Sequence, residues 1–224
     1  MERLIESFFD PAVMRTSLPY LVRGAVVTLQ LCALVIPLGL LGGLVLAILY
    51  ALHLRWLNLL LVVCVDVLRA FPPLVLLVFV YYGLPFLGLE LPALYAVVLA
   101  FFLNTASYYG EILRAGVESI PHGQWEAARA TGLTRGQTLT HVVVPQAVRN
   151  VLPDLASNTL EVAKLTSLAS VVALPELLRM ARVAQGITFN PTPLILAALM
   201  YLLLLWPCVR LLSRMERRLL APAA

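Results

Sequence analysis

The residues of this sequence that could do chemistry are a few polar and ionisable side chains within otherwise apolar stretches. In the segment 151–173, Ser157, Glu161 and Lys164 recur at i, i+4 and i+7, so on a helix they share one face, and Asn158 lies beside them. A charge at the centre of a bilayer costs about 2.5–3.5 kcal/mol on insertion scales, so such residues are functional candidates. Glu161 either contacts a cationic group of a solute or is neutralised by Lys164.

Two more charged pairs have the spacing of helix neighbours. Asp66 and Arg69 are three residues apart, as are Glu111 and Arg114, so each pair can form an internal ion pair. We expect both to be structural braces, with direct solute contact as the alternative for the first. Polar residues also end the segment 92–112, where Asn104 and Ser107 either face a solute pathway or form hydrogen bonds between helices.

Catalytic and metal-binding patterns are missing from the sequence. His53, His122 and His141 are scattered, with no H-E-x-x-H motif and no serine nucleophile motif. There is also no G-x-x-x-x-G-K-[ST] loop to hold nucleotide phosphates. We therefore expect neither an enzyme nor a metal site in this chain.

Long apolar runs must position these side chains. Hydrophobic residues make up 61% of the 224 residues and charged residues only 12%, which is too little charge for the surface of a soluble domain. The sequence predicts an all-α membrane protein with one domain over 1–224 and a core over about 20–215. Five transmembrane helices are expected, over about 22–51, 57–83, 92–112, 151–173 and 193–213.

One polar stretch, over about 113–150, separates the third and fourth expected spans. Its composition favours short helices, and it is too long for an idle connection. Glu126, Ala127 and Ala128 precede Gly132, and a second helix is expected to be broken at Pro145. Small residues let another protein approach the first helix closely, so we interpret the stretch as a docking surface. The alternative is an amphipathic connector without a partner.

The order of these residues resembles the EAA loop of bacterial ABC importer permeases, in the branch that handles polar amino acids such as histidine, lysine, arginine, glutamine and opines. The matching residues run in order along nearly the whole chain: Arg69 with Pro72, Tyr81 to Pro85, Ser119-Ile120-Pro121, Gly123-Gln124, Glu126-Ala127-Ala128, Gly132, Pro145-Gln146-Ala147, and Lys164 with Thr166-Ser167-Leu168. Three positions depart from the family pattern. Ala70-Phe71 replaces Gly-Thr before Pro72, Leu165 replaces a common Asp, and Glu161 replaces a small or apolar residue.

The resemblance implies the fold and the partners. It implies a type I importer permease with a cytoplasmic coupling helix in the loop between helices three and four. A separate ATPase subunit would bind ATP and magnesium and receive the loop through Glu126, Ala127, Ala128, Gly132 and Pro145. A second permease subunit, identical or related, and an external solute-binding protein would complete the importer. Glu176, Arg179 and Arg182, in the segment 174–192, either meet that binding protein or form an ordinary interfacial helix.

Orientation follows from the arginines. With five spans and the C-terminus inside, nine arginines lie on the inner side and five on the outer side, which favours an external N-terminus in a bacterial inner membrane. This places the loop 113–150 in the cytoplasm. An ATP-independent transporter or channel remains the competing interpretation of the spans and buried charges, but it gives no reason for the docking loop.

Overall fold

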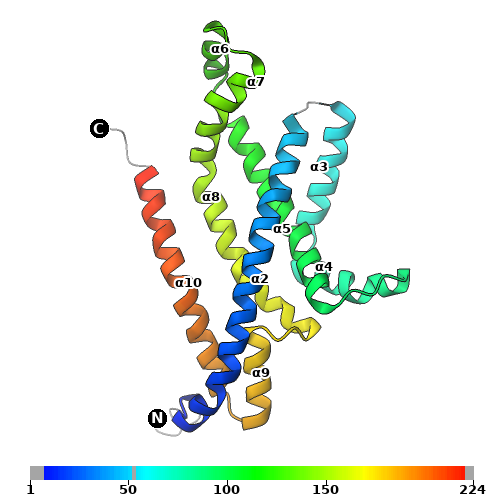
Figure 1. Cartoon of the computed structure of the whole chain (residues 1–224), viewed down its shortest axis with the longest axis vertical. Coiled ribbons are helices and arrows are strands. Elements are labelled where there is room, and N and C mark those ends of the chain that lie inside the picture. The colour runs from blue at the N-terminus through cyan, green and yellow to red at the C-terminus, as the bar shows by residue number, and fades with distance from the viewer. Residues whose placement is uncertain (1–7, 52–53, 220–224) are drawn as a thin grey trace. The chain divides into compact units, whose positions relative to one another are not determined.

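All the regular elements in the part of the chain that the computed structural model describes are helical. It describes residues 8–51 and 54–219, with side chains to 214. The elements are α2 (Pro11–Ala51), α3 (Arg55–Ala70), α4 (Pro73–Val78), η1 (Phe79–Gly83), η2 (Leu84–Leu87), α5 (Ala93–Glu118), α6 (His122–Ala130), α7 (Arg135–Thr138), η3 (Leu139–Val143), α8 (Val144–Leu165), η4 (Thr166–Val172), α9 (Leu177–Thr188) and α10 (Thr192–Leu219) (Figure 1).

Three of these helices are long and apolar enough to cross a membrane: α2, α5 and the part of α10 over Thr192–Arg214. The segments Arg55–Ala70 and Pro73–Leu87 add a fourth crossing if together they form one broken span. The break lies at Phe71 and Pro72, because a residue before proline avoids the α conformation. The α-helix α8 coincides with most of the expected fourth span, and it continues as the 3₁₀ helix η4. Five crossings therefore stay a prediction.

Helix α2 is much longer than the expected span over 22–51. It begins at Pro11 and contains 41 residues, about twice the 20 that a bilayer requires. Asp10 starts it, because the Asp10 carboxylate accepts from the backbone N–H groups of Ala12 and Val13 at 2.8 and 3.3 Å. Helix α5 likewise continues past residue 112 to Glu118.

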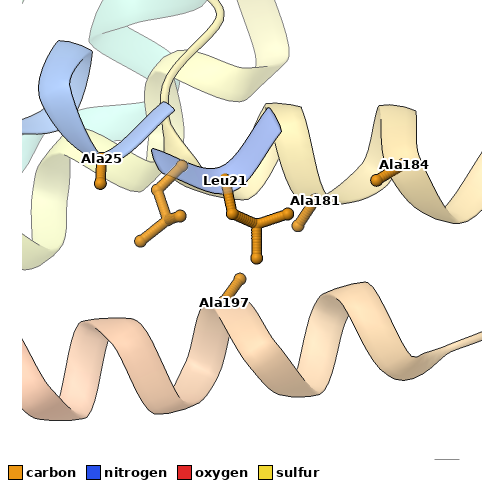
Figure 2. Close-up of a cluster of buried hydrophobic side chains, with 6 residues drawn as sticks. Leu21, Ala25, Ala181, Ala184 and Ala197 are labelled. Atoms are coloured by element: carbon orange, nitrogen blue, oxygen red, sulfur yellow. The ribbon is translucent and has the colours of Figure 1, made fainter. Parts of the chain in front are cut away.

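The chain forms two compact units, each with its own packing. The first comprises Met1–Pro37, Phe71–Phe102 and Leu160–Arg210. Its apolar core joins two leucines and four alanines from three helices: Leu21 and Ala25 of α2, Leu177, Ala181 and Ala184 of α9, and Ala197 of α10 (Figure 2). Small residues on facing helices let their backbones approach closely, which compensates for the weak driving force for helix association in lipid.

The second unit comprises Leu38–Ala70, Leu103–Thr159 and Leu211–Ala224. Its packing relies on Gly39 and Gly43 of α2, where a Cβ atom would lie 2.6 Å from side-chain atoms of Thr105 and Tyr109 of α5. Tyr109 is fully buried, and its hydroxyl shares a 2.7 Å hydrogen bond with that of Thr159 on α8. Helices α2, α5 and α8 are thus fixed to one another in this unit.

Candidate functional site: the polar loop and the membrane charges

The expected docking helix is α6, which lies with α7 at the beginning of α8 (Figure 1). It starts after Pro121 and runs to Ala130, and Gly132 follows with a φ of 89°. This left-handed conformation is the usual way to end a helix at glycine, since a side chain there would be strained. Gly132, which the sequence analysis assigned to the docking loop, therefore follows the end of α6 and terminates this helix.

The two faces of α6 differ in what they contact. Ala128 is buried, and Trp125 packs against the small apolar cluster of Ile120, Val143 and Ala147 beneath the loop. In contrast, Glu126 and Ala127 are exposed. The expected coupling residues therefore divide: Ala128 supports the helix from below, whereas Glu126 and Ala127 form an outward surface.

The segment between α6 and α8 contains the short helix α7 and the π-helical turn η3. Thr134 and Gln137 form a reciprocal capping box at the start of α7, which satisfies backbone groups at that helix end. A π-helical turn, η3, then leads directly into α8, whose second residue is Pro145. The helical conformation is continuous from Arg135 to Leu165, so Pro145 does not end a helix as the sequence suggested. The regular α-helical pattern is instead interrupted by the π-helical turn η3, directly before the proline.

Arg69 finds its carboxylate partner on a different helix from the one expected. Its Nη1 lies 3.8 Å from Oε1 of Glu111 on α5, and its guanidinium stacks over the Tyr108 ring at 5.3 Å. Asp66 is exposed, and within the described residues it has no ion pair. The stacking on Tyr108 draws the arginine toward α5, so the structure does not bring Asp66 and Arg69 together.

Glu111 and Arg114 do come together, as their spacing predicts. Arg114 donates from Nε to Oε2 at 3.0 Å and from Nη2 to Oε1 at 2.6 Å, and its Nη1 reaches Glu118 at 2.5 Å. The same guanidinium lies 5.8 Å from the ring centroid of Tyr50 on α2. Two-point contacts of this kind fix geometry as well as charge, so this network braces α2, α3 and α5 in the second unit.

The polar face of α8 is largely uncovered. Ser157, Glu161 and Lys164 are all exposed, and Lys164 Nζ donates to Glu161 Oε1 at 2.5 Å. The side chains of this pair are 53% and 67% exposed, so the ion pair is open to a third charged group. The Nδ2 group of Asn158 is buried and has no hydrogen-bond partner.

The polar pair of α5 has a different environment. Asn104 and Ser107 are both buried in the second unit, and the Ser107 hydroxyl donates to the Asn104 carbonyl oxygen at 2.6 Å. This hydrogen bond stays within the helix rather than crossing to another one. The Asn104 amide nitrogen is buried without a partner.

Comparison with known proteins shows the family of the chain. Residues 39–221 match the model of the family described as "Binding-protein-dependent transport system inner membrane component". The chain belongs to this family. The permease is 32% identical to the arginine transport system permease protein ArtQ of Bacillus subtilis, over 90% of this chain and 93% of that protein. It is also 32% identical to the octopine transport system permease protein OccM of Rhizobium radiobacter, over 93% and 89%.

A solved structure agrees with the assignment. The permease superposes with a TM-score of 0.87 on a chain of an amino acid ABC transporter crystallised with histidines, with 33% identity over 93% of this chain and 98% of that one. The interpretation as a multi-helix membrane permease is confirmed. The close packing at Gly39 and Gly43 was missed in the sequence, although their four-residue spacing was a readable signal for helix contact.

Proposed function

We propose that this permease forms the transmembrane path of an ATP-driven importer for polar amino acids or amino-acid-like solutes. The observation that carries the proposal is the outward surface of α6, where Glu126 and Ala127 are exposed and nothing lies within 4 Å of the position that a Cβ of Gly132 would take. A separate ATPase subunit, with its own ATP and magnesium, occupies this surface. The whole chain acts as one permease domain.

In this proposal the chain crosses the membrane five times, with the N-terminus outside and the C-terminus inside, so that α6 lies on the cytoplasmic side. The arginine distribution supports this orientation. A second permease subunit is needed because one subunit with five helices is too small to enclose a solute pathway. The exposed face of Ser157, Glu161 and Lys164 supports this arrangement, since hydrocarbon disfavours such groups. A solute-binding protein delivers the solute from outside.

The docking surface is tested by substitution and reconstitution with the ATPase subunit. Gly132→Trp fills the open space and Glu126→Lys reverses a charge, so each should reduce transport-stimulated ATP hydrolysis to the basal rate. Leu203→Trp is the matched control, because Leu203 is 74% exposed on the apolar α10. Normal stimulation in both loop variants would overturn the docking assignment. Uptake into vesicles that contain no ATP would instead favour an ATP-independent transporter.

The amino-acid substrate class rests on the relatives and on Glu161. The relatives include permeases named for arginine and octopine transport. In our proposal Glu161 exchanges Lys164 for the cationic group of a solute as it passes. Glu161→Gln should then lower the uptake of cationic amino acids by about tenfold relative to neutral ones, which corresponds to about 1.4 kcal/mol. Unchanged selectivity would leave Glu161 as the partner of Lys164 only.

A further inference from the structure

The buried carboxylate of Glu176 belongs neither to the outward surface of α6 nor to the polar face of α8. Glu176 precedes α9 in the first unit, and its side chain is completely shielded from solvent. Its two oxygens accept three hydrogen bonds. Oε1 accepts from the backbone N–H of Arg179 at 2.7 Å, and Oε2 accepts from the N–H of Leu178 at 2.8 Å and from the Tyr201 hydroxyl at 2.8 Å. Because Tyr201 belongs to α10, this carboxylate joins the first turn of α9 to α10.

The same turn of α9 is joined to α2. The backbone N–H of Leu177 donates to the Thr28 hydroxyl at 3.1 Å. The two backbones touch at Gly24, where a Cβ atom would lie only 2.8 Å from the Leu177 Cα atom. Any side chain at position 24 would therefore push α9 away from α2.

Helices α2 and α10 are also joined directly, near the start of each helix. The backbone N–H of Asp10, just before α2, donates to the hydroxyl of Thr192 at the start of α10 at 3.2 Å. Each pair among α2, α9 and α10 therefore shares a hydrogen bond, and the alanine-rich core in Figure 2 lies among all three. Three pairwise contacts around one core resist sliding and rotation better than any single contact.

We propose that Glu176 is a positioning residue that holds α9 in one rigid body with α10 and the N-terminal part of α2, and that this body moves as a unit during transport. The carboxylate acts through its contacts and touches no solute or partner. Of the two roles that the sequence left open for Glu176, full burial argues against contact with the solute-binding protein and favours an ordinary helix without that contact.

The charge of Glu176 gives this role a measurable signature. Burial raises the pKa of Glu176, while its backbone donors, Tyr201 and the charge of Arg182 oppose that increase. Thr28 of α2 and the residues of η4 contribute no charge. Because the pKa of Glu176 is raised, the packing of α9 is most stable while this carboxyl group is protonated. That stability falls as pH rises from the ordinary pKa of a glutamate through the raised pKa, because burial disfavours the charged form. Glu176→Gln should remove that slope.

The experiment measures both packing and transport in the full chain with its partner subunits. In a background where Cys32, Cys64 and Cys208 are replaced by serine, Ala184→Cys and Ala197→Cys, at two positions of one buried cluster, allow α9 and α10 to be joined by oxidation to a disulfide. If the helices move as one body, the cross-linked protein should retain at least about half of its uptake. Loss of uptake on cross-linking, with full uptake before it, would overturn the proposal.

Glu176→Ala tests the residue itself. We expect amide hydrogen exchange in α9 to accelerate at least about tenfold and uptake to fall at least about fivefold, and cross-linking α9 to α10 should restore uptake. Failure of the cross-link to restore uptake would indicate that Glu176 contacts a partner or solute, against the proposal. Tyr201→Phe, which removes one donor, should give a smaller change of the same kind if Glu176→Ala does not fold.

Tyr109→Phe is the matched control, since it removes a buried hydroxyl contact in the other unit, and it should leave exchange in α9 unchanged. The uptake measurements rest on the proposed importer function, but hydrogen exchange does not. An unsubstituted protein without ATP-driven uptake would count against the importer, whereas unchanged exchange in both Glu176→Ala and Tyr201→Phe would count against the positioning role alone.

Discussion

The glycines of the long helices and the glycines of the polar loop have opposite surroundings. At Gly24, Gly43 and Gly116 a Cβ atom would meet a neighbouring helix at 2.8, 2.6 and 2.7 Å. At Gly123 and Gly136 nothing lies within 4 Å. The first group is required by the packing of the chain itself. The second group has no such packing reason within the described residues, a feature that it shares with Gly88 and Gly186 outside the loop, so its role depends on the docking surface proposed above.

The largest effect is expected where the colliding atoms belong to a backbone. A Cβ at position 43 would lie 2.8 Å from the Gly110 nitrogen, and backbone atoms of a packed helix cannot move aside. Gly43→Leu should therefore destabilise the protein by about 3 kcal/mol or more. Thermal unfolding in detergent, monitored by circular dichroism, measures this. A shift equal to that of Gly123→Leu would contradict the comparison.

Gly110→Ala should have an intermediate effect. The new Cβ would lie 3.0 Å from two side-chain atoms of Leu46 on α2, and a leucine side chain can shift where a backbone cannot. We expect a loss of about 1–2 kcal/mol in the same assay. Leu46→Ala removes the Cδ1 atom but keeps the Cβ atom, so it should relieve part of the clash, and the double variant should lose less than the sum of the two single variants. Strictly additive losses of stability would contradict a clash between the side chains at positions 46 and 110.

Gly132→Ala isolates backbone strain from packing. Its φ of 89° is unfavourable for alanine, but no atom stands in the way of the methyl group. The expected cost is about 1 kcal/mol of stability, from the backbone alone. Gly132→Asn is the control, because asparagine tolerates the left-handed conformation better and should cost less. Equal losses for the two variants would contradict a purely conformational role.

The smallest effect on stability is expected at Gly123, within the first turn of α6. Alanine is the better helix former, so Gly123→Ala should stabilise the isolated permease by about 0.5 kcal/mol. If the loop surface receives an ATPase subunit, Gly123→Leu should nevertheless weaken that association, measured by co-purification at several salt concentrations. Full retention of the complex would mean that Gly123 lies outside the contact.

Local spacing predicted some charged contacts and failed for others. Glu111 and Arg114 are helix neighbours, and Arg114 binds Glu111 through two hydrogen bonds. The same three-residue spacing suggested Asp66 and Arg69, but Arg69 reaches Glu111 instead. Spacing fixes which side chains can meet along one helix. It does not include Tyr108 of the neighbouring helix, whose ring holds the guanidinium close to α5.

The sequence by itself determined the class of the protein and most of its helices. An apolar fraction of 61% with 12% charge requires a lipid environment, and breaks at proline and glycine mark the ends of several helices. The polar loop was readable because its small residues and its Gly132 terminator act locally. Family membership then followed from residues spread along the chain.

Only the tertiary structure decided which polar groups are buried and which remain open. Glu176 lies in a segment that reads as an exposed amphipathic helix, yet α2 and α10 enclose it completely. Glu161 lies in an apolar run, yet it stays exposed beside Lys164. Periodicity identifies the face of a helix, but the free energy of a charge depends on what covers that face. That covering comes from segments distant in sequence, so it became visible only when the helices were packed together.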